Sequence, residues 1–186
     1  MKKQIVLATS NPHKVEEINA IVTDFEFILP PKDFDPVENG ETFEQNSYIK
    51  AKEANRLSGL LTLADDSGLC VDALNGEPGI HSARYEQTAQ KRIDKLLNVM
   101  KNIKNRKARF VCAMTLIAPN GDVIAQVRGE CHGEIDKTQK GQNGFGYDPI
   151  FIVDGYDKTM AELTEDEKNK ISHRAKALEK ILEYLK

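Results

Sequence analysis

Two adjacent carboxylates at the end of a short apolar stretch constrain the fold more than any other feature of this sequence. Asp65 and Asp66 follow a short stretch with Leu60, Leu61 and Leu63, and Ser67 and Gly68 come next. A carboxylate at the end of a strand is unfavourable unless it is hydrated, paired or bound to a cation. Acidic pairs beside such a glycine turn are typical Mg²⁺ sites, because Mg²⁺ takes one or two carboxylates together with waters and substrate phosphates. The alternative is a polar turn between two strands.

Composition limits the size of the protein and its classes of partner. With 186 residues, 40% of them hydrophobic, the chain can bury one substantial core. This predicts one domain or a closely packed two-lobed one, and we expect a single domain over residues 1–186. The net charge is −3 and both signs are well mixed, so we expect neither a nucleic-acid surface nor a membrane surface.

The cysteines and the N-terminus bear on the compartment. Cys70, Cys112 and Cys131 are widely spaced and form neither a metal-ligand pattern nor a disulfide framework. The apolar run near the N-terminus is too short for a signal peptide or a membrane span. We therefore expect a soluble cytoplasmic protein with reduced thiols.

Strand and helix patterns alternate along the chain, which predicts an α/β fold with a mixed sheet. We expect strands at residues 5–8, 25–29, 60–65, 69–73, 108–118, 122–128 and 150–153. We expect helices at residues 12–22, 42–58, 88–100 and 164–185. Capping boxes begin the second and the last of these helices, and Pro119-Asn120-Gly121 predicts a hairpin between two strands.

Two segments could bind phosphate. Thr9, Ser10 and Asn11 precede a helix, whose N-terminus favours an anion, and Lys14 adds a positive charge. The segment lacks the glycines of a P-loop, and ordinary helix capping explains it equally well. Residues 38–54 supply acidic side chains near a helix start and lysines farther along, a pattern that a solvated helix face would also show.

Two later segments could recognise a base. Three glycines within residues 141–146 surround Phe145 and precede Tyr147, a plausible clamp for a flat ring, although a turn with core aromatics is the alternative. In the last predicted helix, Lys168, His173 and Arg174 lie off the apolar stripe. Three hydrogen-bond donors close together suit carbonyl oxygens or phosphate.

Taken in order, these motifs resemble the Ham1/RdgB family of inosine triphosphate pyrophosphatases. The motifs are TSNPHK, ENGETFEQNSYIKA, ADDSGLCVDALNGEPGIHSARY, GFGYDPIF and KNKISHRAKAL. The resemblance implies an elongated two-lobed α/β domain with a central mixed sheet flanked by helices, an active-site cleft between the lobes, and a homodimer. It also implies Mg²⁺-dependent hydrolysis of ITP, dITP and XTP to the nucleoside monophosphate and pyrophosphate.

The resemblance also assigns roles to residues. Asp66 matches the catalytic general base and a metal ligand, and Glu38 matches the second Mg²⁺ ligand. The positions that match substrate-binding residues are Thr9, Ser10, Asn11, Pro12, His13, Lys14, Lys50, Ser67, Phe145, Gly146, Tyr147, Asp148, Lys168, His173 and Arg174. Many members have glycine where this chain has Ser10, which would matter if the turn required a positive φ.

The residue types suit this chemistry. Cleavage of a phosphoanhydride requires charge neutralisation and an in-line water, and either Asp65 or Asp66 could activate that water. Arg174 and Lys168 only donate hydrogen bonds, so they would pair with the 6-carbonyl of hypoxanthine or xanthine and not with adenine. The alternatives are a Maf-type nucleotide pyrophosphatase, whose N-terminal signature differs, and a nucleotide-binding module without catalysis. The sequence does not rank ITP, dITP and XTP.

Overall fold

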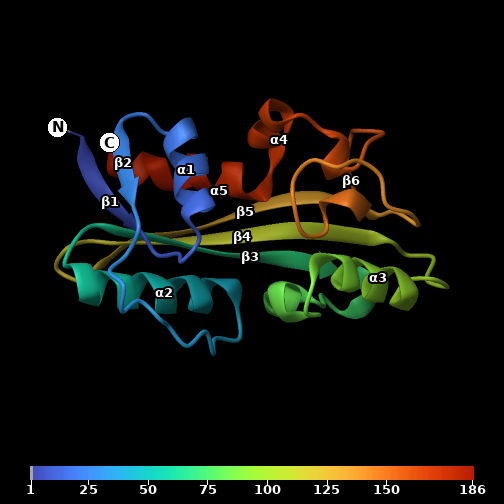
Figure 1. Ribbon diagram of the computed structural model, residues 1–186, viewed down its shortest axis with the longest axis horizontal. Helices are drawn as coiled ribbons and strands as arrows, with labels where there is room; N and C mark the ends of the chain where they lie inside the picture. Colours follow the sequence, from blue (N-terminus) through green and yellow to red (C-terminus); the bar gives the residue numbers. More distant parts are fainter. Residues whose placement is uncertain (1) are drawn as a thin grey trace. The chain divides into compact units, whose positions relative to one another are not determined.

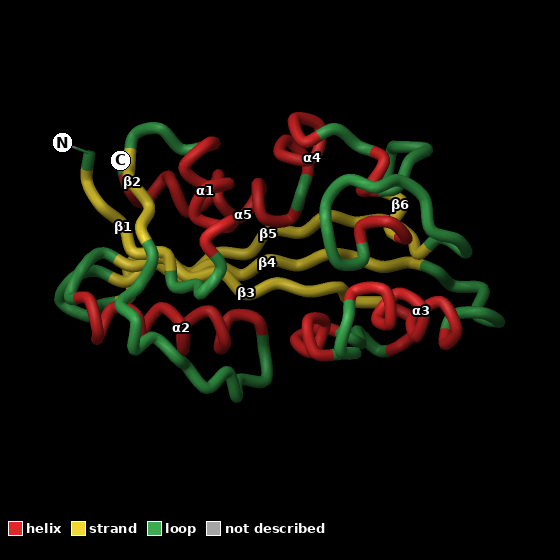
Figure 2. Tube along the Cα trace, viewed as in Figure 1, coloured by secondary structure: helices red, strands yellow, loops and turns green. Residues whose placement is uncertain are grey.

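One mixed sheet of six strands organises the fold (Figures 1 and 2). The computed structural model describes residues 2–186, except for the side chains of His13, Glu17 and Ala20. The strands are β1 (Lys3–Leu7), β2 (Phe25–Ile28), β3 (Thr62–Val71), β4 (Lys107–Ile117), β5 (Val123–Ile135) and β6 (Phe151–Val153). The α-helices are α1 (Pro12–Ile21), α2 (Phe43–Ser58), α3 (Ala89–Val99), α4 (Glu165–Ile171) and α5 (His173–Leu182). The predicted α/β class with a mixed sheet is confirmed.

The strand directions explain why the sheet is mixed. In the order β2-β1-β3-β4-β5-β6, β1 is parallel to both β2 and β3. Helix α1 supplies the crossover between β1 and β2, as parallel neighbours require. Strand β6 pairs antiparallel with β5. The predicted hairpin is also present, because Ala118 donates its N–H to the carbonyl of Asp122 at 2.9 Å, between β4 and β5.

The chain divides into two compact units. Unit 1 comprises the residues up to Asp66 with Ala113–Arg128 and Leu178–Lys186, and unit 2 comprises Ser67–Cys112 and Gly129–Ala177. The chain passes between them within β3, β4, β5 and α5. The prediction of a single domain over residues 1–186 stays a prediction.

Each unit has a hydrophobic core of its own. In unit 1, α1 and α2 lie on opposite sides of the strands (Figure 1). A cluster of small and branched side chains packs there: Val6, Ala8, Ala51, Ala54, Ala64 and Ile117. In unit 2, α3 and α4 lie on opposite sides of the strands, and the core is larger and richer in aromatic and long aliphatic side chains. The small side chains of α2 allow close packing against its sheet neighbours.

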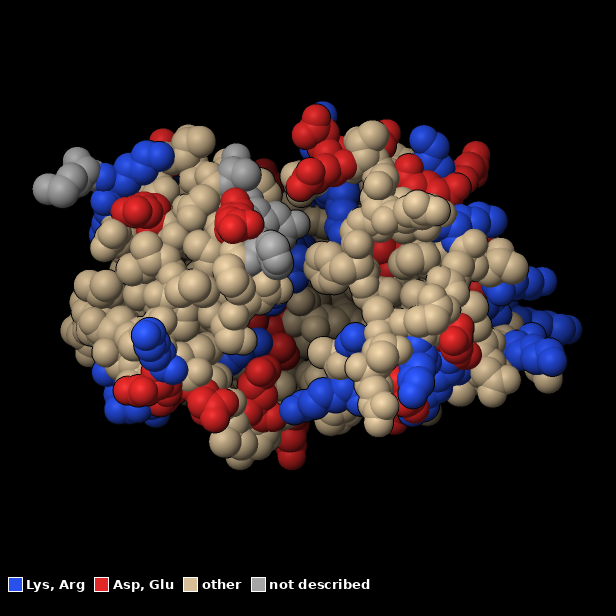
Figure 3. Space-filling view, in the orientation of Figure 1, with Lys and Arg blue, Asp and Glu red and all other residues tan. Residues whose placement is uncertain are grey.

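The surface carries charges of both signs. On the face drawn in Figure 3, Lys and Arg side chains lie among Asp and Glu side chains with uncharged surface between them, and the net charge of the chain is −3. Within residues 2–186, no helix combines the length and apolar character needed to cross a membrane.

Strand β3 departs from the sequence prediction. The prediction of a strand that ends at Asp65 and a separate strand at 69–73 is wrong, because β3 continues over ten residues from Thr62 to Val71. A continuous strand can carry both carboxylates because lysines from other elements neutralise them. No local sequence pattern indicated those partners.

The last helix also departs from the prediction. It is two helices, because Ser172 adopts an extended conformation (φ −64°, ψ 154°) and its Oγ accepts a hydrogen bond from the N–H of Ala175 at 3.1 Å. Ser172 therefore caps α5. Because α5 starts at His173, the buried face of this helix differs from the predicted one. It includes His173, Ala177 and Ile181, which are spaced by four residues and at most 7% exposed.

Replacement of Ser172 by alanine should lower the free energy of unfolding by about 1 kcal/mol, the usual effect of losing an N-cap oxygen. Urea denaturation followed by circular dichroism measures this change. An unchanged free energy of unfolding would show that the hydroxyl does not stabilise α5.

Candidate active site

One cluster of candidate residues lies at the carboxyl end of parallel strands in unit 1. Strand β1 ends at Leu7, which is in register with Leu63 of β3. Thr9 and Asp65 therefore both lie two residues beyond the paired positions. Ligands of parallel α/β sheets bind at this end of the strands.

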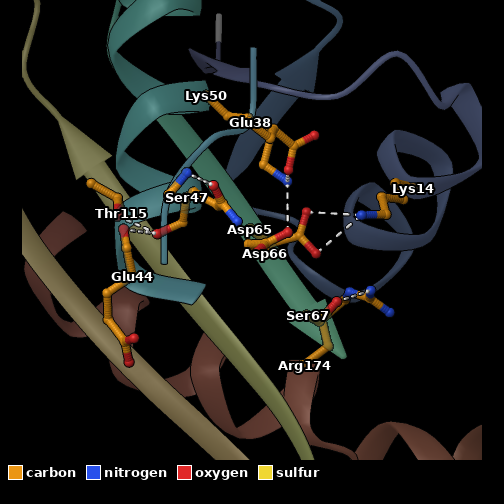
Figure 4. A network of polar contacts seen from close by, with 12 residues as sticks. Lys14, Glu38, Glu44, Ser47, Lys50, Asp65, Asp66, Ser67, Thr115 and Arg174 are labelled. Atoms are coloured by element: carbon orange, nitrogen blue, oxygen red, sulfur yellow. Dashed lines mark hydrogen bonds and ion pairs between the residues drawn. The ribbon is translucent and has the colours of Figure 1, made fainter. Parts of the chain in front are cut away.

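Two lysines neutralise the adjacent carboxylates of β3 (Figure 4). Lys14 of α1 donates to both oxygens of Asp65, at 3.0 and 3.1 Å. Lys50 of α2 lies 3.1 Å from Oδ1 of Asp66 and 3.2 Å from Oε2 of Glu38. Successive side chains of a strand point to opposite faces, which is why the two carboxylates find partners on different helices.

Asp66 retains one open oxygen. Its Oδ2 is buried and has no hydrogen-bond partner within the described part of the chain. Burial raises the pKa of Asp66, and the charge and hydrogen bond of Lys50 only partly offset this effect. Asp65, only 3% exposed, has both oxygens bonded to Lys14. The two carboxylates therefore differ: one is fully paired, and the other can accept a proton or a cation.

Lys50 remains a cation despite its burial. Burial by itself would lower its pKa, but the charges of Asp65, Asp66 and Glu38 outweigh this effect and raise the pKa above its usual value. The ammonium is therefore a fixed positive charge between two carboxylates.

A cavity of about 340 Å³ opens beside these pairs. It is lined by Ala8, Thr9, Ser10, Asn11, Lys14, Phe34, Asp35, Pro36, Glu38, Lys50 and Asp65. The cavity thus brings together the two segments that the sequence suggested for phosphate, which lie more than twenty residues apart.

The turn before α1 combines capping with exposed donors. Thr9 Oγ1 accepts from the N–H of Asn11 at 3.1 Å, a hydrogen bond within the turn that precedes Pro12, and the helix-capping alternative stays a prediction. Ser10, Asn11 and Pro12 are exposed, and the side chain of His13 lies outside the described residues. Ser10 does not adopt a positive φ, so this turn does not require the glycine common in the family.

The carboxylates fit a hard cation only in part. Among residues 2–186, apart from the undescribed side chains, no group of three or more His, Cys, Asp or Glu is arranged to hold a metal. Glu38 and Asp66 nevertheless converge on one ammonium, and Asp66 Oδ2 is open. Two carboxylates suit Mg²⁺, which completes its coordination with waters and phosphates.

A second cluster of predicted binding residues lies in unit 2. Asp148, only 4% exposed, accepts hydrogen bonds at Oδ2 from the N–H of Phe145 (3.0 Å) and from Lys168 Nζ (2.6 Å). Lys168 Nζ lies 4.6 Å and Arg174 Cζ lies 5.8 Å from the centre of the Phe145 ring. The ring is therefore held over two cations while remaining 59% exposed.

Glycine is required in the loop that carries Phe145. Gly144 has φ +71°, and a Cβ there would lie 2.1 Å from Oδ2 of Asp148 and 3.0 Å from Nζ of Lys168. Gly146 also has a positive φ, of +62°. At Gly144 the loop backbone thus lies so close to the buried carboxylate of Asp148 that only glycine fits there.

Other predicted base-binding residues are buried. Tyr147 is 5% exposed and donates its hydroxyl to the carbonyl of Ser82 at 2.8 Å. His173 is 7% exposed and stacks on Phe110, with the ring centres 4.9 Å apart. The expectation that His173 lies away from the core is wrong, because α5 begins in a different phase. A role in binding substrate stays a prediction for both residues.

Arg174 has a contact that sequence patterns do not indicate. Its Nη2 donates to the hydroxyl of Ser67 at 3.3 Å (Figure 4). The two residues are 107 positions apart in the chain. Ser67 directly follows Asp66 in β3, so the hydrogen bond ties Arg174 to the residue next to the open carboxylate.

The comparisons with known proteins decide the family. A model of the Ham1 family matches residues 5–184. The chain belongs to the Ham1 family. A dITP/XTP pyrophosphatase of a Nostoc species is 44% identical over 184 residues, which cover 98% of this chain and 94% of that protein. One from Bacillus cereus is 47% identical, covering 97% and 94%.

Solved structures agree with this assignment. The Ham1 protein of Staphylococcus aureus has a TM-score of 0.91 and is 42% identical, with 98% of each chain covered. A nucleoside-triphosphatase / dITP/XTP pyrophosphatase of Mycobacterium abscessus has a TM-score of 0.80 and is 40% identical, covering 96% of this chain and 98% of that chain. The resemblance is confirmed, and the Ham1 family replaces the Maf-type alternative.

The cysteines of this Ham1-family chain are buried. Cys70, Cys112 and Cys131 form no disulfide among the described residues. Burial raises the pKa of Cys131 to about 11. A thiol with this pKa is almost entirely protonated near neutral pH, which supports direct attack by water over covalent catalysis.

The raised pKa of Asp66 predicts how an Asp66→Asn variant changes stability. At about pH 3 and below, under the ordinary aspartate pKa of about 3.9, the carboxyl is largely protonated in both the folded and the unfolded chain. We therefore expect the variant and wild type to have similar stability there. As pH rises through the raised folded pKa, wild type loses stability relative to the variant. The variant should therefore have the higher melting temperature at pH 7 without metal.

Thermal unfolding in metal-free buffers between these pH values measures the difference. Asp94→Asn, on the exposed surface of α3, controls for the loss of one negative charge. A difference that shrinks as the pH rises would contradict the assigned direction of the Asp66 pKa.

Proposed function

We propose that this chain is a Mg²⁺-dependent hydrolase that converts ITP, dITP and XTP to the nucleoside monophosphate and pyrophosphate. The observation that carries the proposal is the buried carboxylate of Asp66, with one open oxygen and a raised pKa beside a fixed ammonium. Near-full-length relatives named dITP/XTP pyrophosphatases support this choice of substrate class.

The cavity of unit 1 is the proposed site for the triphosphate. Lys14 and Lys50 supply positive charge, and the exposed turn at Ser10 and Asn11 precedes the N-terminus of α1, where an anion is stabilised. Glu38 and Asp66 would hold the Mg²⁺. When bound, Mg²⁺ supplies charge neutralisation along the triphosphate.

Asp66 is the proposed general base. Its open Oδ2 accepts the proton of a water that attacks the α-phosphorus, and pyrophosphate leaves with the electrons of the broken P–O bond. A pKa raised by burial makes this carboxylate a better proton acceptor than an ordinary aspartate. Asp65 is the weaker candidate, because both its oxygens accept from Lys14.

The cluster of unit 2 is the proposed site for the base. The exposed ring of Phe145 offers a face for stacking, and Asp148 fixes Lys168 in place. Lys168 and Arg174 would donate to the 6-carbonyl of hypoxanthine or xanthine. Adenine has an amino group there and would leave these donors unpaired. Guanine shares the 6-carbonyl, so its rejection has to come at position 2.

A cytoplasmic location and a homodimer complete the proposal. Buried cysteines that form no disulfide among the described residues are compatible with a reducing compartment. Analytical ultracentrifugation of the purified chain tests the dimer directly.

Pyrophosphate release from ITP, XTP, GTP and ATP tests the reaction. With Mg²⁺ we expect rapid release from ITP and XTP, and a loss of at least roughly 100-fold in Asp66→Asn, the scale of general-base catalysis. Asp94→Asn is the matched control and should retain activity. Binding of ITP without pyrophosphate release by the wild-type chain would favour the nucleotide-binding module instead.

Arg174→Ala should reduce the preference for ITP over ATP, measured as the ratio of the two kcat/KM values, by roughly tenfold or more, since it removes a donor to the 6-carbonyl. Arg109→Ala, which breaks a surface ion pair with Asp72, is the control and should leave the ratio unchanged. An unchanged ratio in Arg174→Ala would reject the base-reading role of α5.

A further inference from the structure

A buried amide of α2 holds the loop that carries Glu38. Asn46 is only 1% exposed, and its Oδ1 accepts a hydrogen bond from the N–H of Gly40 at 2.8 Å. Gly40 lies two residues after Glu38. The backbone next to Glu38, a proposed metal ligand, is thus hydrogen-bonded to a buried side chain of α2.

The loop lies too close to α2 for any side chain at that point. A Cβ on Gly40 would lie 2.7 Å from Oδ1 of Asn46 and 2.8 Å from Cβ of Gln45. The neighbouring N–H of Glu41 is also held, by Oε1 of Gln45 at 2.6 Å. Two consecutive backbone donors of the loop therefore bond to consecutive side chains of one helical turn.

The same helix carries the cation that meets Glu38. Asn46 and Lys50 are four residues apart in α2, so they lie on the same face of the helix, one turn apart. Glu38 reaches Lys50 at 3.2 Å while its side chain is 34% exposed. A side chain with that much exposure is not fixed by packing, so its position depends on how its backbone is held.

We propose that Asn46 is a positioning residue for the metal site: through Gly40 it fixes Glu38 beside Asp66 and so sets the affinity for Mg²⁺. This inference rests on the proposed function. Groups that orient metal ligands contribute strongly to affinity, and their loss typically weakens metal binding by roughly 10- to 100-fold.

A role in folding alone is the competing explanation. A buried asparagine that satisfies a backbone N–H stabilises the protein whatever it does for a metal. Asn55 provides a matched control, because it lies on the same helix, is 7% exposed, and donates to the carbonyls of Leu60 and Ala118 at 2.8 and 2.9 Å. Its loss should destabilise the chain without touching the Glu38 loop.

Calorimetric titration of Mg²⁺ into the protein saturated with an α,β-imido analogue of ITP measures metal affinity without turnover. We expect Asn46→Ala to raise the dissociation constant for Mg²⁺ roughly tenfold. Asn55→Ala should lower the melting temperature and leave that constant within about twofold of wild type. In a Glu38→Gln background, Asn46→Ala should produce no further change, because the two residues act on one ligand.

The outcomes separate this inference from the proposed function. An unchanged Mg²⁺ affinity in Asn46→Ala, or an equal loss with and without the Glu38→Gln change, would overturn the positioning role while leaving the hydrolase intact. A wild-type chain that binds the analogue but no Mg²⁺ would overturn the metal site itself, and the positioning role with it.

Discussion

The structure depends on the neutralisation of two consecutive carboxylates inside a continuous strand. Asp65 and Asp66 would be unfavourable in β3 without their partners, since a buried unpaired charge destabilises the folded state by several kcal/mol or shifts its pKa (~3–5 kcal/mol). Lys14 and Lys50 supply the opposite charges from α1 and α2. The pairing therefore fixes both helices to the strand at the point where the candidate site lies.

The two pairs leave different chemistry on adjacent residues. Both carboxylate oxygens of Asp65 accept hydrogen bonds from Lys14. Asp66 instead shares Lys50 with Glu38, and its buried Oδ2 has no hydrogen-bond partner within the described residues. Desolvation then raises the pKa of Asp66. Strand β3 thus carries a structural ion pair at Asp65 and a candidate general base at Asp66. Because both side chains are aspartates, their different partners account for the difference in role.

Sequence patterns predicted well those helices whose ends are set by hydrogen bonds between residues close in the sequence. Helices α2 and α4 begin after Thr42 and Thr164, whose hydroxyls accept hydrogen bonds from the N–H groups of Gln45 and Glu167, as the capping patterns predict. The break at Ser172 escaped prediction because a serine inside a helical pattern is compatible with either a continuing helix or a new cap. The choice depends on burial, and it is this choice that places His173 in the core.

The sequence alone determined the family, the α/β class and most of the candidate residues, because motifs and caps are properties of short segments. Tertiary structure decided which of Asp65 and Asp66 is open, that β3 does not end between them, and that Asn46 holds the loop of Glu38. Lys14 and Asp65 are 51 residues apart, and Lys50 and Asp66 are 16 apart. No local sequence period encodes such pairs, and the burial that raises the pKa of Asp66 exists only once distant segments have packed together.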